Sequence, residues 1–252
     1  MLLGIIGAVP DEIRLLRESL DVRETVHAGK RDYLRGTLHG QETILALSRI
    51  GKVAAASTAT TLIERFGVGA ILFTSVAGGL SPSLNVGDIV VGSSLLQHDL
   101  DARPLFSRWE IPLLGLGHIE ADRALTQHIA EAARRFLAES FSSHITAADR
   151  EEFGLHRPKV VTGLIVSGDQ FIDHAEEVAQ LQKDLPDALC VEMEGAAVAQ
   201  VCHEHGVPFA IVRTISDKAD HSAAVDFGKF SSRIAAPYSA GIIEALLEKV
   251  PL

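Results

Sequence analysis

Four charged residues stand near the ends of two apolar stretches in the last third of the chain. Glu192 and Glu194 end the first stretch, and Arg213 and Asp217 stand at the end of the second, Pro208–Ile215. A stretch so apolar is typical of a strand covered on both faces in a parallel sheet, where charges are rare. Open α/β sheets bind ligands beyond the carboxyl ends of their strands, so these groups could form an active site. Helix-capping acids and a surface salt bridge would give the same pattern.

The elements that would position these groups can be read from hydrophobic patterning and turn residues. The Ala- and Val-rich segment between the two strands predicts a helix, and Asp220 adds a carboxylate beyond the second strand. Further strands are predicted at Leu2–Ala8, Tyr33–Leu38, Glu42–Leu47, Ala70–Ser75, Gly87–Asp99 and Lys159–Ser167. Helices are predicted from Pro10, over 52–66, over 121–139, and over 227–249 with a bend at Pro237. The segments Leu100–His118 and Ser140–Pro158 are predicted to be irregular.

Length and composition favour one soluble α/β domain spanning residues 1–252. The chain is 47% hydrophobic and 5% aromatic, and its sequence contains no repeat or linker. Its formal charge is −10 without a run of Lys or Arg, which argues against nucleic acid or an anionic membrane as a partner. No apolar run reaches the ~18 residues of a membrane span. The two cysteines, Cys190 and Cys202, indicate a reducing compartment, so a cytoplasmic protein is expected.

Several familiar catalytic motifs are absent from the sequence. It contains no G-x-x-x-x-G-K-[ST], no G-x-G-x-x-G and no G-x-S-x-G, which argues against a nucleoside triphosphatase, a dinucleotide enzyme and an α/β-hydrolase. His203 and His205 bracket Glu204, but a solvated helix end explains this pattern better than a metal site. His98, Asp99 and Asp101 have no second group of ligands nearby in the sequence. No metal and no cofactor are therefore expected.

Six segments in colinear order carry a resemblance to a known family. They are MLLGIIGAVPDEIRLL, SRIGKVAAA, VAGGLSPSLNVGDIVV, GLIVSGDQFI, VEMEGAAVAQVCHEHGVPF and VRTISDKAD. Together they resemble the nucleoside phosphorylase superfamily, and within it the 5′-methylthioadenosine/S-adenosylhomocysteine nucleosidases. The resemblance covers nearly the whole chain and weakens only between about 100 and 160. It implies a central mixed, twisted sheet flanked by helices in a three-layer sandwich, a homodimer, and hydrolysis of an adenine thionucleoside without metal or cofactor.

The resemblance also implies catalytic roles. Adenine leaves ribose poorly as an anion, so an acid must protonate N7 as the N-glycosidic bond breaks through an oxocarbenium-like state. The family's acid belongs to an I-S-D motif, which gives Asp217 here, oriented by Ser216. Burial at the end of an apolar strand would raise the pKa of this carboxyl, as an acid working near neutral pH requires. Glu12 matches the base that activates water on the opposite face of the sugar.

Other residues match positions that bind the substrate. Glu194 matches the acid that binds the ribose 2′- and 3′-hydroxyls, and it would stabilise positive charge on the ring. Arg213 is expected to hold the water and the carboxylates, and Phe171 to stack on adenine while its backbone and that of Ile172 contact the base edge. Met193 is expected to contact the sugar, and the strand-end residues Val76, Ala77 and Gly78 are also expected to contact the substrate. Val9, Ile50 and Phe227 are expected to form apolar walls around the 5′-substituent. Phe106 and Pro112 are expected to come from a partner subunit.

Each of these residues also has a purely structural interpretation. Glu12 could be only a first-turn acid stabilised by the helix dipole, and Phe171, Phe227 and Ile50 could be core residues. Glu192 fits the first-turn interpretation better than Glu12 does, so it is left out of the catalytic set.

The chain departs from the family pattern at two kinds of position. Where the family often has T-G-S-A-G-G, this chain has Thr74–Gly79, so Val76 lacks a hydroxyl expected near the water and Ser75 replaces a glycine. Gly195 replaces a common Ala. The Leu100–His118 loop is longer, and Ser140–Pro158 resembles an insertion. Both lie where the partner and the 5′-group are expected, so the resemblance specifies the reaction better than the substrate.

Three alternatives to this hydrolase remain at the level of sequence. A phosphorylase of the superfamily would have an Arg in a strand-end R-x-G-[ST] motif, but Phe73–Ala77 has none and Glu12 would repel the phosphate. A non-catalytic nucleoside-binding protein would not need Glu12. A sister nucleosidase acting on another adenine nucleoside, such as aminofutalosine, is left open.

Overall fold

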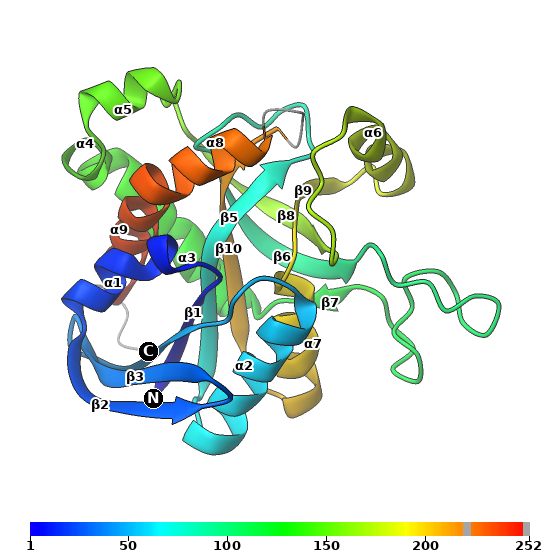
Figure 1. Cartoon of the computed structure of the whole chain (residues 1–252), viewed down its shortest axis with the longest axis horizontal. Coiled ribbons are helices and arrows are strands. Elements are labelled where there is room, and N and C mark those ends of the chain that lie inside the picture. Colours follow the sequence, from blue (N-terminus) through cyan, green and yellow to red (C-terminus); the bar gives the residue numbers. More distant parts are fainter. Residues whose placement is uncertain (219–222, 249–252) are drawn as a thin grey trace.

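The computed structural model of the chain describes residues 1–218 and 223–248 as a mixed α/β fold (Figure 1). Its strands are β1 Leu3–Gly7, β2 Asp21–Ala28, β3 Arg31–Leu38, β4 Gln41–Leu47, β5 Ala70–Gly79, β6 Ile89–Gln97, β7 Ile119–Glu120, β8 Val160–Ser167, β9 Ala188–Glu192 and β10 Phe209–Asp217. Its helical segments are η1 Pro10–Ile13, α1 Arg14–Ser19, α2 Lys52–Phe66, α3 Arg123–Arg135, η2 Phe136–Ser140, α4 Phe141–His144, α5 Ala147–Glu152, α6 Ala175–Asp184, α7 Gly195–His205, α8 Ala223–Phe230, η3 Ser231–Ala235 and α9 Ala236–Leu247.

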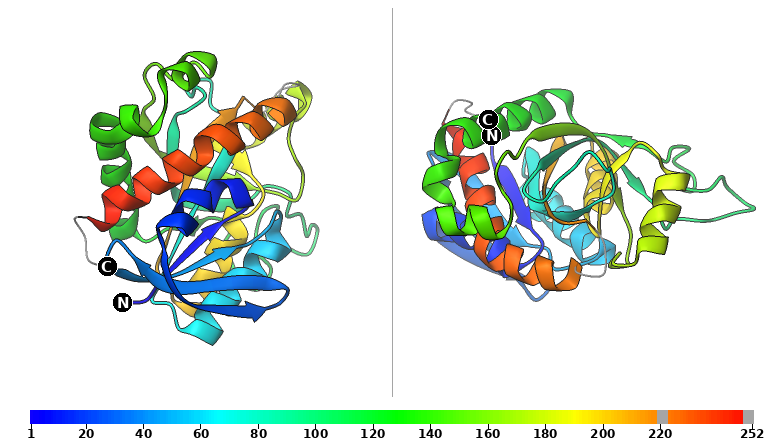
Figure 2. Two further views of the ribbon diagram at one scale, coloured as in Figure 1. Left: turned by 60° about the vertical axis from the view of Figure 1, so that its left-hand side comes forward. Right: turned by 90° about the horizontal axis from the view of Figure 1, so that it is seen from above.

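One long strand, β5, joins two parts of the sheet. It pairs in parallel with β1 and β10, and its terminal residues Gly78 and Gly79 pair with β9. The pairings of β10 with β6, β6 with β8 and β8 with β9 close a ring of strands back onto β5. On its other side, the sheet continues through β1, β4, β3 and β2, as the view from above shows (Figure 2). The carboxyl end of β5 is therefore where strands from both parts meet.

Helices cover both faces of this sheet. α2 packs on α7 on one face, whereas α3 packs on α9 on the other, next to α1. Successive strand residues point to opposite faces, so Leu72 and Val212 lie in the core under α3 and α9, while Phe73 and Ile211 lie in the core under α2 and α7. The predicted fold class, a central mixed sheet flanked by helices, is confirmed. None of the described helices is both long and apolar enough to cross a membrane.

The predicted strands all occur, with their ends moved by a few residues, but the predictions for other segments are incomplete. Ser140–Pro158, predicted to be irregular, contains α4 and α5, and the N-terminus of α5 is capped by Thr146, whose Oγ1 accepts from the Asp149 N–H at 3.1 Å. β2 and α6 were not expected from the sequence. β2 is an edge strand exposed along most of its length, so it lacks the alternation of buried and exposed residues that indicates a strand.

The C-terminal helix begins earlier than predicted and contains a π-helical turn, Ser231–Ala235, between α8 and α9. Pro237 follows in the first turn of α9. Because proline has no backbone N–H, the ordinary bond to the carbonyl four residues back cannot form, and the helix departs here from regular α-helix by this π-helical turn. The predicted helix end at Lys249 and the carboxylate of Asp220 lie outside the described residues.

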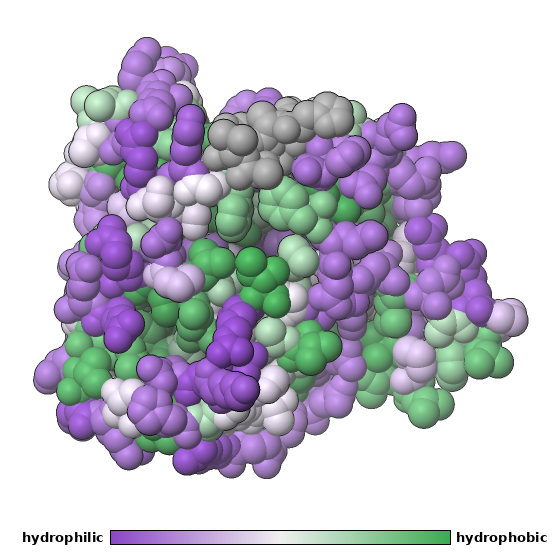
Figure 3. Space-filling view, viewed as in Figure 1, coloured by the Kyte–Doolittle hydropathy of each residue, from purple (hydrophilic) through white to green (hydrophobic). Residues whose placement is uncertain are grey.

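Residues 100–118 form an arm that projects from the body of the molecule (Figures 1 and 2). A single isolated bridge, between Ile111 and Leu116, interrupts its irregular backbone, and the Trp109 Nε1–H donates to the His98 carbonyl at 3.0 Å at its base. Leu105 and Leu113 are 83% and 90% exposed, and hydrophobic surface is visible on the arm in Figure 3. The prediction of an irregular apolar loop is therefore correct.

Candidate active site

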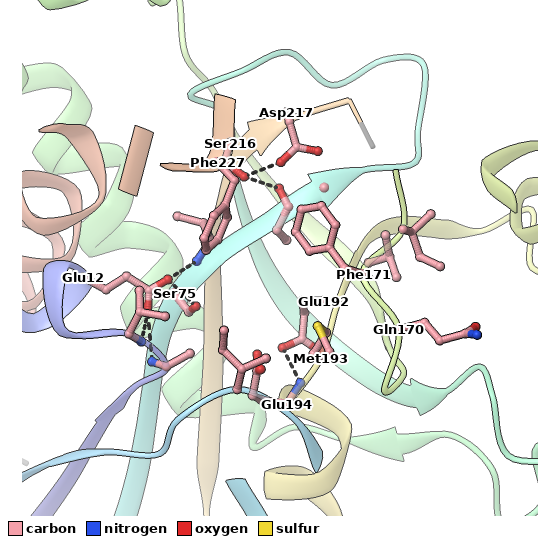
Figure 4. A pocket seen from close by; sticks show the side chains of 18 residues that line it. Glu12, Ser75, Gln170, Phe171, Glu192, Met193, Glu194, Ser216, Asp217 and Phe227 are labelled. Atoms are coloured by element: carbon pink, nitrogen blue, oxygen red, sulfur yellow. Dashed lines mark hydrogen bonds between the residues drawn. The ribbon is translucent and has the colours of Figure 1, made fainter. Parts of the chain in front are cut away.

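A cavity lies where the carboxyl ends of β1, β5, β9 and β10 meet, and it encloses about 630 Å³ with its open mouth included. Carboxylates approach it from three sides: Glu12 from η1, Glu192 and Glu194 at the end of β9 and just after it, and Asp217 at the end of β10 (Figure 4). We call it the reaction cavity.

Glu12 is held by four hydrogen-bond donors. Its Oε2 accepts from the N–H groups of Ala8 at 2.9 Å and Val9 at 3.0 Å, and its Oε1 accepts from Ser75 Oγ at 2.7 Å and Val76 N at 3.2 Å. Pro10 begins η1 and places Glu12 in its first turn, directly over the end of β1. Burial raises the pKa of Glu12, while the hydrogen bonds from Ser75, Val9 and Ala8 lower it in part. The carboxyl group is thus fixed in direction and poised to take up a proton.

Glu194 is a buried carboxyl held by one backbone donor. Gly51 N–H donates to its Oε1 at 2.9 Å. Gly51 has a φ of 100°, a left-handed conformation that glycine adopts without strain, and this turns its N–H towards the cavity. Burial, followed by the negative charge of Glu192, raises the pKa of Glu194, and the charge of Arg213 opposes both.

Glu192 and Arg213 form a buried ion pair behind the cavity. Arg213 is fully buried, and its Nε and Nη2 donate to Glu192 Oε2 at 3.1 and 2.6 Å. Its Nη1 donates to the carbonyls of Phe73 and Val212, and its guanidinium lies 4.1 Å from the Phe73 ring centroid. Glu192 also accepts from Gly195 N at 2.8 Å at the start of α7, and from Ser167 Oγ. Glu192 accepts from the first N–H of α7 but lies before its N-cap, so it is not a first-turn acid as predicted, whereas Glu12 does lie in the first turn of η1. Glu192 is also the partner of Arg213 and lines the cavity.

Asp217 and Ser216 are consecutive residues at the end of β10. The register of β10 against β5 shifts between Ile215 and Asp217, and such an irregularity redirects side chains at the end of a strand. Ser216 Oγ donates to Asp217 Oδ2 at 2.6 Å, and it lies 3.4 Å from the Ala77 carbonyl. Both side chains are buried and line the cavity. The hydroxyl thus orients the carboxyl, as predicted.

Aromatic and aliphatic side chains form the other walls. The rings of Phe171 and Phe227 meet edge to face with centroids 5.9 Å apart, and Phe171 is exposed enough to offer a face to a planar group. Met193, labelled in Figure 4, and Ile50 also line the cavity. None of the described lining residues is a Lys, Arg or His, so the polar groups of this cavity favour a ligand that carries or develops positive charge.

The cavity brings together most of the residues predicted to act there. Those that line it are Val9, Glu12, Ile50, Val76, Ala77, Gly78, Phe171, Ile172, Met193, Glu194, Ser216, Asp217 and Phe227. Arg213 does not line the cavity; it binds Glu192, and its charge lowers the pKa of Glu194 and of Glu12. Phe106 and Pro112 lie in the arm, away from the cavity of their own chain.

Sequence reasoning missed the contribution of Ser75. Val76 does lack a hydroxyl, but the preceding residue brings one to Glu12, and the Val76 backbone N–H adds a second donor. Gln170 and Glu192 also line the cavity without having been predicted to do so. Since Ser75 lies in a strand and Glu12 lies 63 residues earlier, only the pairing of β5 beside β1 reveals their contact.

One cluster of possible metal ligands occurs among the described residues, at Asp173, His174 and Glu177. It lies on the surface at the start of α6, and none of the three residues lines the reaction cavity. Asp99 and Asp101, considered above as ligands, accept from Lys52 and Arg103.

Known proteins resemble this chain over its whole length. A family model described as the phosphorylase superfamily matches residues 2–248. A 5′-methylthioadenosine/S-adenosylhomocysteine nucleosidase from Neisseria meningitidis, in complex with methylthio-immucillin-A, is 34% identical with a TM-score of 0.85, over 99% of both chains. An S-adenosylhomocysteine nucleosidase from Streptococcus pyogenes, with 5-methylthiotubericidin, is 30% identical with a TM-score of 0.85, over 100% of this chain and 98% of its own. The futalosine hydrolase of Helicobacter pylori is 33% identical with a TM-score of 0.84, over 99% of this chain and 98% of its own.

Proposed function

The chain belongs to the phosphorylase superfamily, and we propose that it is a nucleosidase that hydrolyses the N-glycosidic bond of adenine thionucleosides. Its substrates are 5′-methylthioadenosine and S-adenosylhomocysteine, and its products are adenine and the free thioribose. The nucleosidases similar to it support this assignment. The observation that carries it is the placement of Glu12, fixed by four donors, in one cavity with Asp217.

In this proposal Asp217 is the general acid. The adenine stacks on the Phe171 ring, the backbone of Phe171 and Ile172 contacts its edge, and N7 faces the Asp217 carboxyl. As the bond to C1′ lengthens, Asp217 gives its proton to N7, so that adenine leaves as a neutral molecule. Ser216 holds the carboxyl through the 2.6 Å hydrogen bond.

Glu12 is the general base, on the other side of the sugar. It takes a proton from a water molecule as the water oxygen attacks C1′, which bears positive charge in the transition state. The ordered donors around Glu12 keep the acceptor oxygen aimed while the reaction proceeds, so little reorganisation is needed.

Glu194 binds the ribose 2′- and 3′-hydroxyls, and Met193 packs against the sugar. The positive charge on the ring grows only as the transition state is approached, so a carboxylate here stabilises that state more than the bound substrate. Arg213 and Glu192 keep the segment that carries Glu194 in place: Glu192 accepts from the Glu194 N–H at 3.2 Å.

Water is favoured over phosphate as the nucleophile. Phosphate needs cationic donors, and none of the described lining residues is a Lys, Arg or His. Arg213, the nearest buried cation, is already bound to Glu192 and to two carbonyls. A phosphate beside Glu12 would add negative charge to a site with several carboxylates, which is unfavourable.

A futalosine-type nucleosidase is the second candidate. The Helicobacter pylori futalosine hydrolase is about as similar to this chain as the two other nucleosidases are. Both candidates use the same acid, base and ribose contacts and differ only in the 5′-substituent.

The enzyme is proposed to act as a homodimer. The exposed leucines of the arm form an apolar surface that a second subunit would cover. Contact with a partner would place Phe106 at the 5′-end of the neighbouring cavity, beside Ile50 and Phe227.

Adenine release from 5′-methylthioadenosine, followed with and without phosphate, tests the proposal. We expect equal rates, with free methylthioribose and no sugar 1-phosphate as the product. Release that depends on phosphate would indicate a phosphorylase instead. Tight binding of the nucleoside without any release would indicate a binding protein.

A further inference from the structure

One wall of the reaction cavity belongs to a helix near the end of the chain. Phe227 lies in α8 and lines the cavity, where its ring meets the edge of the Phe171 ring. α8 continues directly into η3, and η3 packs against η1, which carries Glu12. We call residues 223–235 the α8–η3 segment. Its position determines where the Phe227 wall stands, and it also borders the element that carries the proposed base.

The short helix α5 binds this segment through two ion pairs. Arg233 of η3 donates from Nη1 to Glu152 Oε2 at 2.6 Å, and from Nη2 to Asp149 Oδ1. Asp149 and Glu152 are three residues apart in α5, so they lie on one face of the helix. Figure 1 shows α5 in green beside the orange helix that contains α8 and η3. One planar guanidinium thus binds two carboxylates of α5, which fixes its direction as well as its distance.

An aromatic contact links the ion pairs to the buried side of the α8–η3 segment. Phe153, at the end of α5, meets Phe230 edge to face with ring centroids 5.7 Å apart, and the Arg233 guanidinium lies 5.2 Å from the Phe153 ring centroid. Phe230 is fully buried and lies about one helical turn after Phe227. α5 therefore contacts the segment both at its surface and at the turn next to Phe227.

The contacts of α5 with this segment are special in their place in the chain. α5 lies within Ser140–Pro158, which resembles an insertion relative to the family pattern. It has six residues and buries none of them, so it adds little to the core. A helix this short is marginal in water without tertiary contacts. The position of its three contacting residues, Asp149, Glu152 and Phe153, is consistent with a role in supporting the neighbouring helix.

We propose that α5 braces the α8–η3 segment, and that Arg233 is a positioning residue that holds Phe227 at the reaction cavity before the substrate binds. The kinetic part of this inference rests on the proposed function. Without the brace, α8 occupies additional positions, and only the molecules with Phe227 in place bind the nucleoside well. The apparent affinity then falls in proportion to that fraction of molecules. The bound complex is the same as before, so kcat is unchanged.

The variant R233Q tests the brace by separating KM from kcat. An exposed ion pair contributes about 1.4- to 5-fold, so the loss of both pairs should raise KM for 5′-methylthioadenosine roughly two- to twentyfold, with kcat near the wild-type value. E152Q removes one pair and should give a smaller rise, and adding it to R233Q should change KM no further. R23Q is the matched control, because Arg23 forms a similarly exposed ion pair with Glu42 in the β2–β4 part of the sheet.

Salt provides a second test on the unaltered protein. 5′-Methylthioadenosine has no net charge at neutral pH, so salt does not screen a charge on the substrate. Because salt weakens exposed ion pairs, KM of the wild type should rise towards that of R233Q at about 0.5 M KCl, whereas KM of R233Q should change little.

Hydrogen exchange of the backbone amides measures the position of the helix without turnover. Amides of residues 227–235 should exchange faster in R233Q than in the wild type, and at the wild-type rate in R23Q. The inference requires both the faster exchange and the higher KM. Faster exchange confined to α5, a fall in kcat at unchanged KM, or an unchanged KM would each overturn it. If the wild type releases no adenine, the proposed function is wrong, and the exchange of residues 227–235 alone decides whether α5 holds α8.

Discussion

The reaction cavity and the arm present their functional residues in opposite ways. In the cavity, Glu12 is 1% exposed and each of its oxygens accepts two hydrogen bonds. In the arm, Leu113 is 90% exposed, and the backbone is held by turns and one isolated bridge instead of by strands or helices. The body of the fold thus fixes the geometry of the proposed acid and base, whereas the proposed role of the arm depends on a partner subunit. Changes in the cavity should therefore affect the chemical step, and changes in the arm should affect binding.

Asp217→Asn should give the largest effect. The amide keeps the shape of the side chain but has no proton to give to N7, so kcat should fall by about 10²–10⁴-fold. The measurement is adenine release, with calorimetric binding of a non-hydrolysable substrate analogue as the control for an intact cavity. An activity above a few per cent of wild type would show that another group is the acid.

Glu194→Gln should reduce activity and stabilise the fold. The pKa of Glu194 is raised in the folded protein, so the fold binds this proton more tightly than the unfolded chain does. The contribution of Glu194 to the free energy of unfolding is then greatest below the ordinary pKa near 4.5, and it decreases as the pH rises through the raised pKa. Glutamine cannot ionise, so the variant should have a higher Tm than wild type at pH 9.

The expected gain is a few degrees, since about 1 kcal/mol moves Tm by roughly 2–4 °C in a domain of this size. Thermal unfolding at pH 9 and near pH 4 measures it, and the difference should disappear at the lower pH. A variant that is less stable than wild type at pH 9 would mean that the hydrogen bond from Gly51 outweighs the buried charge.

Ser75→Ala should move the acidic limb of the pH profile. The Ser75 hydroxyl lowers the pKa of Glu12 against the larger effect of burial, so its removal should raise that pKa further. Because the base must be ionised, kcat/KM should begin to fall at a higher pH than in wild type when the pH is lowered. The plateau at alkaline pH should change little. A hydrogen bond to a charged group contributes about 1.5–3 kcal/mol, equivalent to a shift of roughly 1–2 pH units. A lower plateau of kcat/KM, with the acidic limb at the same pH as in wild type, would show that Ser75 positions Glu12 without changing its pKa.

Phe106→Ala should give the smallest effect, and this effect should be on substrate binding and not on the chemical step. If the partner's arm closes the 5′-end of the cavity, KM should rise by about tenfold, the loss expected for ~1–2 kcal/mol of apolar contact, while kcat stays near the wild-type value. Steady-state kinetics measures KM and kcat, and light scattering measures the oligomeric state. A monomer with full activity at micromolar concentration would contradict the role of the arm.

Much of the site could be predicted from the chain alone because it is local in sequence. Glu12 follows β1 within a few residues, and Ser216 and Asp217 end the apolar run of β10, so a strand prediction already places them at one edge of the sheet. β2 and α5 could not be predicted in the same way. β2 is an exposed edge strand whose two faces scarcely differ in burial, and α5 is a short helix indicated mainly by its cap at Thr146.

The sequence by itself determined the fold class, which follows from hydrophobic periodicity. The residues proposed as the acid, the base and the ribose contact follow from the resemblance of its strand-end motifs to a known family. The tertiary structure alone decided how these residues are held. Ser75 contacts Glu12 across 63 residues because β5 lies beside β1, and Arg213 pairs with Glu192 because the ring of strands brings β10 and β9 to the same end of β5. A separate cavity lined by Arg17, Arg31 and Arg49 also arises only in three dimensions, where α1, the β2–β3 turn and the segment after β4 converge. Such contacts depend on strand register and side-chain direction, and spacing along the chain does not encode either of these.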